Sequence, residues 1–262
     1  YYYIMRPNHM LRELLTRYHA DEISLEDALR EIDGLRFETV GEFACIDPGR
    51  SVRCGIPEVV LAEGKDTGHL CGIIPKIVEA SGKCIVSRIS QSQEPDLREL
   101  AEKNGLLLRF NPEARMMIFS KTQGVALTGG VVAVITAGTS DIRVAEEARV
   151  IAEEMGCRVC TAYDVGAAGI HRLFPALKKC LDADVFIVAA GREGTLPSVV
   201  AGLVDRPVIG VPVSTGYGFM GEGQAALASM LQSCSVLSVV NIDAGFTAGA
   251  YASLIANLVA MK

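Results

Sequence analysis

The chain has 262 residues, half of them hydrophobic, and 25 Lys and Arg against 31 Asp and Glu give a formal net charge of −6. This composition allows a large buried core and argues against global disorder. The acidic balance argues against a nucleic-acid or anionic-membrane surface. The longest apolar runs, such as 131–135, are far shorter than the ~20 residues that a membrane helix needs. We therefore expect a soluble cytoplasmic protein with no nucleic-acid or membrane partner.

Eight cysteines raise the question of a disulfide framework. The chain is long and rich in core residues, so it does not need disulfides for stability. Residues 1–6 also lack the basic start and apolar stretch of a signal peptide. We therefore expect reduced and mostly buried thiols. Cys157 and Cys160 form the only close pair, and a zinc site would need a second pair at similar spacing.

The first part of the chain predicts a small α/β domain over residues 1–125, with 1–9 left out as a possible artificial extension. The pattern over 11–32 is helical, with Ser24 placed to cap its second half and Asp27 three residues later. Strand-like and helical segments then interleave. We predict strands at 59–62, 84–89, 106–110 and 116–119, and helices at 67–80 and 97–104. The sequence assigns no role to this domain.

A regular alternation of apolar strands and helices follows over residues 126–262. We predict strands at 131–136, 158–161, 185–189, 208–211 and 237–241, and helices at 141–155, 169–181, 196–204, 223–231 and 245–259. Near-continuous apolar strands that alternate with helices indicate a parallel sheet covered on both faces. The domain is therefore predicted to be doubly wound, with its ligand crevice at the carboxyl ends of the strands. The sequence contains no P-loop, and no dinucleotide-binding glycine motif directly follows a predicted strand.

Polar and glycine-rich turns follow the predicted strands. Thr139, Ser140 and Asp141 come before a helix, where they could bind a phosphate and a ribose, or cap the helix and complement its dipole. His171 and Arg172 follow the second strand, and the histidine has a structural reading beside the functional one.

The later turns have the same character. Gly191, Arg192 and Glu193 put an ionisable pair beside a glycine, although a solvated Glu193 in a turn before a helix is the alternative. The fourth turn contains Gly216-Tyr217-Gly218, which suits a loop that folds over a ligand, and the fifth contains Asp243. Because the strands end at one edge, these turns predict a site for a nucleotide.

With these residues assembled, the region 130–260 resembles the aminoimidazole ribonucleotide carboxylase/mutase superfamily, which has a flavodoxin-like fold. The resemblance is carried by Gly138–Asp141, by His171-Arg172 and by the stretch 190–202. A closer resemblance is to one branch, the pyridinium-3,5-biscarboxylic acid mononucleotide synthases, which begin assembly of the nickel-pincer cofactor of lactate racemase. It is carried by 55–60, 63–65, 216–218, 233–234 and 240–246, with departures at Ile56, Ala244 and Thr247.

This resemblance implies that nicotinic acid adenine dinucleotide (deamido-NAD) is carboxylated on its pyridinium ring, with CO2 or bicarbonate as the donor, and hydrolysed to release AMP. It implies that Cys234 is the nucleophile that adds to the ring, because a thiolate is both a soft nucleophile and a good leaving group. Glu193 would remove the ring proton, and His171 and Arg172 would bind phosphate or carboxylate. Asp141 and Asp243 would hold ribose or a Mg2+ ion, with no organic cofactor.

The topology places Cys234 before the fifth strand, whereas the other candidate residues follow strands. These two edges of a sheet are a strand length apart. We therefore expect a homo-oligomer, as large as the octamers of the superfamily, in which Cys234 completes a neighbouring site or its loop curls back. Two alternatives stay open: an aminoimidazole ribonucleotide carboxylase of purine synthesis, and a non-catalytic nucleotide-sensing module.

Overall fold

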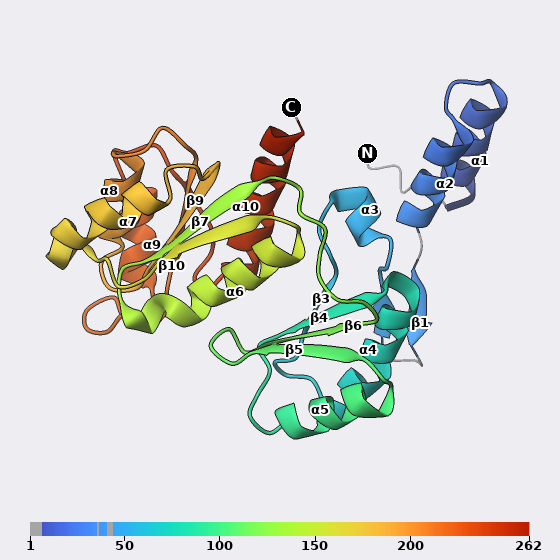
Figure 1. Ribbon diagram of the computed structural model, residues 1–262, viewed down its shortest axis with the longest axis horizontal. Coiled ribbons are helices and arrows are strands. Elements are labelled where there is room, and N and C mark those ends of the chain that lie inside the picture. The colour runs from blue at the N-terminus through green and yellow to red at the C-terminus, as the bar shows by residue number, and fades with distance from the viewer. Residues whose placement is uncertain (1–6, 36, 41–43, 262) are drawn as a thin grey trace.

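The computed structural model describes residues 7–35, 37–40 and 44–261 and shows two α/β units side by side (Figure 1). One unit contains a five-stranded sheet, and the other contains a four-stranded sheet from which a helical hairpin projects. In the part of the chain that the structure describes, we find no helix long and apolar enough to cross a membrane.

The five-stranded sheet is parallel throughout and confirms the predicted doubly wound fold. Its order is β11-β10-β9-β7-β8, so the strand order reverses between β7 and β9. Doubly wound sheets bind ligands at such a reversal, beyond the carboxyl ends of the strands. We call this end of the sheet the carboxyl edge. The strands are β7 (Val131–Thr136), β8 (Arg158–Ala162), β9 (Val185–Ala190), β10 (Val208–Pro212) and β11 (Ser238–Val239).

Helices cover both faces of this sheet because alternate strand side chains point to opposite sides. Val131, Ala133 and Ile135 pack toward one helical layer, and Val132 and Val134 toward the other. The first layer contains α7 (Leu173–Lys179), α8 (Thr195–Ala201) and α9 (Gln224–Leu231), and the second contains α6 (Ile142–Glu154) and α10 (Gly245–Ala260).

The predicted helix at 169–181 is wrong in its first turn. The chain forms a 3₁₀ helix, η2 (Ala167–Arg172), before α7 begins, and it is kinked at Gly169, whose φ of −123° and ψ of 51° are not helical. The fifth strand is also shorter than the predicted 237–241.

The small domain is α/β, as predicted. Its sheet has the order β3-β4-β6-β5, with β3 parallel to β4 and the other two pairs antiparallel. One face packs on two helices. These elements are β3 (Val59–Leu61), β4 (Lys83–Ser87), β5 (Leu107–Asn111), β6 (Met116–Ser120), α4 (Thr67–Ser81) and α5 (Glu94–Lys103).

Four further elements precede this sheet. Helix α1 (Pro7–His19) begins inside the segment that the fold prediction left out, and α2 (Leu25–Gly34) is capped by the Ser24 side chain, which accepts from the Asp27 backbone N–H as predicted. The hairpin of β1 (Glu38–Val40) and β2 (Ala44–Ile46) and the short α3 (Arg50–Cys54) were not predicted. Their apolar stretches are too short to give a periodic signal.

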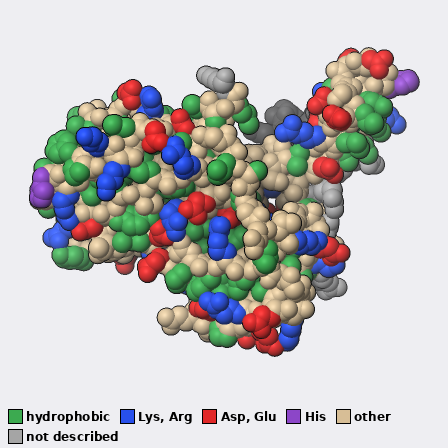
Figure 2. Space-filling model, viewed as in Figure 1, with side chains coloured by type: hydrophobic (Ala, Val, Ile, Leu, Met, Phe, Trp, Pro, Cys, Tyr) green, Lys and Arg blue, Asp and Glu red, His purple; other side chains and the backbone are tan. Residues whose placement is uncertain are grey.

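The second face of the small sheet packs directly on α6 and α10. Ile85, Met116 and Ile118 of the sheet form one buried cluster with Val150 and Ile151 of α6. Helices α6 and α10 are therefore shared by both sheets. Figure 2 shows charged side chains of both signs where α6 meets the small domain.

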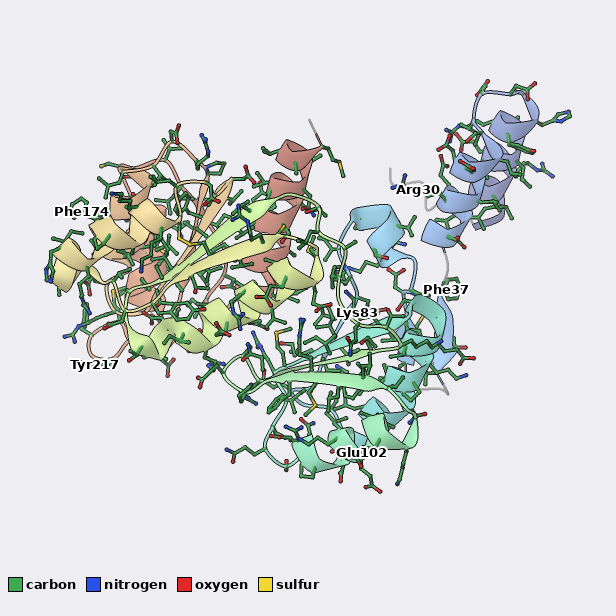
Figure 3. All side chains as sticks on the ribbon, viewed as in Figure 1. Arg30, Phe37, Lys83, Glu102, Phe174 and Tyr217 are labelled. Atoms are coloured by element: carbon green, nitrogen blue, oxygen red, sulfur yellow. A yellow bond between two sulfur atoms is a disulfide. The ribbon has the colours of Figure 1, made fainter. Side chains whose placement is uncertain are left out.

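Charged pairs border this apolar cluster. The Glu154 carboxylate, which is almost fully buried, pairs with Lys83 Nζ at 2.6 Å and with Arg109. Figure 3 places Lys83 at this junction, far from Tyr217.

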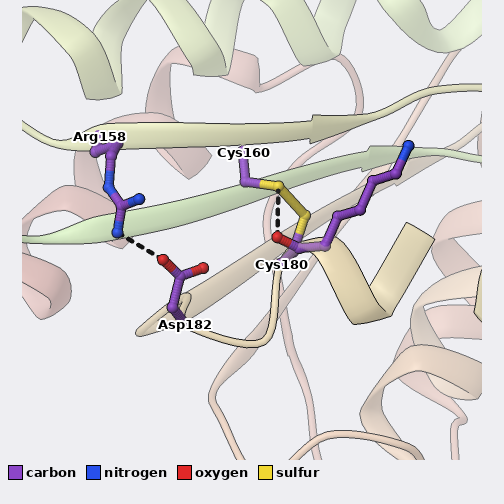
Figure 4. The surroundings of a disulfide bond; sticks show 5 residues. Arg158, Cys160, Cys180 and Asp182 are labelled. Atoms are coloured by element: carbon purple, nitrogen blue, oxygen red, sulfur yellow. Dashed lines mark hydrogen bonds and ion pairs between the residues drawn. A yellow bond between two sulfur atoms is a disulfide. The ribbon is translucent and has the colours of Figure 1, made fainter. Parts of the chain in front are cut away.

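The expectation of reduced, mostly buried thiols is wrong. Cys160 of β8 and Cys180, which follows α7, form a disulfide, with the sulfur of Cys160 also near the Lys179 carbonyl (Figure 4). The two residues are 20 positions apart, and the turns of the fold bring them to a Cα–Cα distance of 5.8 Å, within the range for a disulfide. Six cysteines are free, of which two are buried and three exposed: Cys45, Cys54, Cys71, Cys84, Cys157 and Cys234.

Candidate functional site

The turn after β7 brings a buried carboxylate to the carboxyl edge. Asp141 ends the 3₁₀ helix η1 (Thr139–Asp141), is only 3% exposed, and accepts from the Gly138 backbone N–H at 2.9 Å. Burial raises the pKa of Asp141 above its usual value, while its hydrogen bonds act in the opposite direction. The α6 N-cap is Asp141, not Thr139 or Ser140, whose side chains are exposed to solvent. The alternative that Thr139 or Ser140 caps the helix therefore does not explain why hydroxyl side chains stand at these two positions.

The turns after β9 and β10 contact the Asp141 carboxylate. Thr215 Oγ1 donates to Asp141 Oδ1 at 3.3 Å. Gly191 lies so close that a Cβ there would be 2.9 Å from both Asp141 Oδ1 and Thr215 Oγ1. A Cβ on Gly216 would overlap the Gly191 carbonyl oxygen. Glycine is therefore required at both positions for the three turns to meet.

An exposed pair of side chains marks the outer side of these turns. Arg192 lies over the Tyr217 ring, 4.6 Å from its centroid, and donates to the Tyr217 hydroxyl. Tyr217 is 72% exposed, and Gly218 beside it has φ +90°. An aromatic ring and a guanidinium that stack in solvent can contact a ligand's planar or anionic group.

Asp243 connects the fifth turn to the fourth. Its carboxylate accepts from Ser214 N at 2.9 Å and from Ser214 Oγ at 2.5 Å, and it pairs with Arg143 at 3.3 Å. Its backbone N–H donates to the Pro212 carbonyl at 2.9 Å. Asp243 thus holds the start of the loop between β10 and α9, residues 213–223, which we call the glycine-rich loop, beside the end of β10.

The turn after β8 lies next to this group. The Asp164 backbone N–H donates to Thr136 Oγ1 at the end of β7, and the Asp164 carboxylate pairs with Arg172 at 2.7 Å. His171 and Arg172 are exposed. The guanidinium of Arg172 is therefore near the carboxyl edge but already has an anionic partner.

The predicted nucleophile, Cys234, and the predicted base, Glu193, lie on different loops. Glu193 is exposed between Arg192 and Gly194 at the carboxyl edge. Cys234 is exposed on the loop from α9 to β11, whose Ser235 hydroxyl donates to the Ser198 carbonyl of α8. Within the described residues, no hydrogen bond or ion pair joins Cys234 to the candidate residues in the turns at the carboxyl edge. β11 begins beside Ile209, near the start of β10, so Cys234 precedes the opposite edge, as the topology predicted.

Four site residues were missed by the sequence reasoning. Ser214 and Thr215 stand in the glycine-rich loop, where their hydroxyls were a usable signal. Arg143 and Arg88 gave no local signal, because their partner Asp243 is 100 and 155 residues away in the sequence.

Hydrogen bonds within the protein already engage both carboxylates. Each oxygen of Asp141 and of Asp243 already accepts a hydrogen bond from the protein. Among the described residues, we find no group of three or more His, Cys, Asp or Glu side chains that could hold an ion. We therefore derive no step through Mg2+.

Comparisons with known proteins match both units of the chain. Residues 131–262 match the family model described as AIR carboxylase, and residues 37–121 match one described as a LarB/PurE-like N-terminal domain. An uncharacterized protein of Methanocaldococcus jannaschii is 44% identical over 253 residues, which is 95% of this chain and 97% of that protein.

Two further relatives match only part of the chain. An N5-carboxyaminoimidazole ribonucleotide mutase of M. jannaschii is 37% identical over 119 residues, 44% of this chain and 71% of the mutase. A probable N5-carboxyaminoimidazole ribonucleotide mutase of Methanothermobacter thermautotrophicus is 32% identical over 130 residues, 47% of this chain and 37% of that protein.

Proposed function

The chain belongs to the AIR carboxylase family, and on that premise we propose that it carboxylates the pyridinium ring of deamido-NAD and hydrolyses the phosphoanhydride. The products are pyridinium-3,5-biscarboxylic acid mononucleotide and AMP. The family supports an enzyme of the carboxylase/mutase kind in nucleotide metabolism. The finer assignment is carried by the small domain, which matches a LarB/PurE-like model and packs against the helices behind the site. The mutase matches cover less than half of this chain.

The proposed chemistry solves an electronic problem. A pyridinium ring is electron-poor and does not attack CO2. Addition of the Cys234 thiolate to a ring carbon gives an enamine-like ring whose electron pair forms the new bond to the carboxyl carbon. Glu193 then removes the ring proton, and the electrons of that C–H bond expel the thiolate and restore aromaticity. Water attacks phosphorus separately, and AMP leaves.

The carboxyl-edge residues have binding roles in this proposal. Thr139 and Ser140 offer free hydroxyls for phosphate, and Asp141 accepts from a ribose hydroxyl. Arg192 and Tyr217 contact the exposed part of the dinucleotide, and His171 supplies a further polar contact. The earlier expectation of Mg2+ stays a prediction.

The position of Cys234 supports a site shared between copies of the chain. Two exposed apolar side chains flank it, Leu231 at 66% and Val236 at 95% exposure, and apolar surface of this kind favours association. We therefore propose a homo-oligomer in which the Cys234 loop of one copy faces the carboxyl edge of another. Mixing Cys234→Ala with Glu193→Gln chains, under conditions where subunits exchange, is expected to restore activity to part of the mixed oligomers. No recovery would contradict the shared site.

The reaction itself is tested with deamido-NAD and bicarbonate, by chromatography for AMP and mass spectrometry for the carboxylated pyridine product. Wild type is expected to give both products, and Cys234→Ala no carboxylated pyridine product, with unchanged unfolding in urea. Cys54→Ala is the matched control, because Cys54 is also free and exposed but lies in the small domain. Full activity of Cys234→Ala would refute the nucleophile. Binding without turnover by wild type would favour the nucleotide-sensing alternative, and conversion of a carboxylated aminoimidazole ribonucleotide would favour a purine-pathway enzyme.

A further inference from the structure

The small domain contacts the Asp243 turn at the carboxyl edge through the Arg88 side chain. Arg88 directly follows β4, and its guanidinium donates to the Asp243 backbone carbonyl at 3.3 Å and pairs with Glu63 at 3.0 Å. Asp243 is the residue whose carboxylate holds Ser214 at the start of the glycine-rich loop. A path of direct contacts therefore runs from the small domain to this loop.

Both residues on this path have backbone conformations that need support. Arg88 has φ +56° and Asp243 has φ +54°, in the left-handed region that residues other than glycine rarely adopt. The turn at Arg88 is braced by Arg115, whose Nε donates to the Ile89 carbonyl at 2.7 Å. The turn at Asp243 is braced by Ser214 on one side and Arg88 on the other.

The surroundings of Arg88 are rigid for a second reason. Ser87 Oγ donates to the buried Glu147 carboxylate of α6 at 2.6 Å. A Cβ on Gly245, the first residue of α10, would be 2.9 Å from the same carboxylate. The end of β4 is therefore fixed against Glu147 in the middle of α6, beside the first residue of α10, and Arg88 extends from this fixed point to the Asp243 turn.

The contact is not needed to hold the two units together. The apolar cluster of Ile85, Met116 and Ile118 with α6, and the pairs that Lys83 and Arg109 make with Glu154, join them independently. Loss of the Arg88 guanidinium should therefore leave the domains packed while it frees the Asp243 turn.

We propose that Arg88 is a positioning residue for the nucleotide site, through which the small domain orders the Asp243 turn and the glycine-rich loop. This inference rests on the proposed function for its substrate, but not for its structural content. It gives the small domain a role in substrate binding and not only in assembly.

The first test needs no substrate. Hydrogen exchange, measured by mass spectrometry on the free full-length chain, compares wild type with Arg88→Ala. Peptides over 213–217 and 241–246 are expected to exchange about tenfold faster in the variant, which corresponds to the ~1.4 kcal/mol of one charge-assisted hydrogen bond. Peptides from α5 should not change. Unchanged exchange at 213–217 and 241–246 would overturn the proposal.

The second test measures turnover. For AMP release from deamido-NAD, Arg88→Ala is expected to raise KM about tenfold and to change kcat by less than threefold, because Arg88 orders a binding loop and does not touch reacting atoms. Arg88→Lys keeps a cation with a donor and should recover part of the loss. Arg98→Ala is the matched control, since Arg98 pairs with Glu94 on α5 of the same domain. A normal KM in Arg88→Ala would overturn the positioning role.

The two tests separate the two proposals. If wild type releases no AMP, the proposed function fails, and the exchange measurement still decides the role of Arg88. If Arg88→Ala does not fold, the same exchange comparison is made with Arg88→Lys, which is expected to show faster exchange than wild type in the same two peptides. Wild-type exchange in Arg88→Lys, together with wild-type KM, would then overturn the proposal.

Discussion

The disulfide between Cys160 and Cys180 closes a loop that contains the whole turn after β8, including His171 and Arg172. A bridge across 20 residues removes conformational entropy mainly from the unfolded chain. For a loop of this length, the chain-entropy relation gives about 3 kcal/mol of stabilisation. We therefore expect that loss of the bridge lowers the free energy of unfolding by about this amount.

The cleanest perturbation is Cys160→Ser. Cys180 is fully buried and remains as a small apolar thiol, whereas Cys160 is partly exposed and its replacement hydroxyl can donate to the Lys179 carbonyl. Urea unfolding should shift to lower concentration by roughly 1 M, given the usual dependence of unfolding free energy on urea. Cys54→Ser is the control, because Cys54 is free and exposed.

Two further measurements test whether the bridge is present and whether it stabilises the protein. Under denaturing, non-reducing conditions, thiol titration should find six reactive thiols, because two of the eight cysteines are bridged. Reduction of wild type should reproduce the shift of Cys160→Ser, whereas the affinity for AMP should change less than twofold, since the bridge acts mainly on the unfolded state. Eight reactive thiols, or equal midpoints for oxidised and reduced protein, would refute the bridge or its stabilising role.

Two other substitutions test the site and the domain junction. Gly216→Ala places a methyl group on the Gly191 carbonyl oxygen and should raise KM for deamido-NAD at least tenfold with little change in the urea midpoint; an unchanged KM would show that the two turns need not touch. Burial raises the pKa of Glu147, so its contribution to stability is present at low pH and is lost as pH rises through the folded pKa. Glu147→Gln should therefore flatten the decline in urea midpoint between pH 5 and pH 8, and an identical decline in both proteins would contradict this.

The C-terminal fold could be predicted from the sequence because its central strands β7, β9 and β10 are buried on both faces. Runs such as 131–135 are apolar throughout, and a helix follows each strand. The polar turns at the carboxyl edge were predictable for the same reason, since parallel strands bring all of them to one edge. Asp141, Gly191, Gly216 and Asp243 do lie in mutually contacting turns.

Contacts between distant segments could not be predicted. Neither the pairing of Cys160 with Cys180 nor the approach of Arg88 to Asp243 has a characteristic local spacing. The interruption at Gly169 also escaped prediction, because a glycine in an otherwise helical pattern is compatible with a continuous helix. These features depend on tertiary packing.

The shared layer of α6 and α10 determines how the small domain should be studied. Val150 and Ile151 of α6 face the small sheet, while other residues of the same helix face the parallel sheet. Removal of the small domain would expose this apolar surface and leave Glu147 and Glu154 without Ser87 and Lys83. A C-terminal fragment would therefore lose stability as well as the Arg88 contact. Its inactivity could not distinguish the two causes, so substitutions at Arg88 in the full chain are the informative experiment.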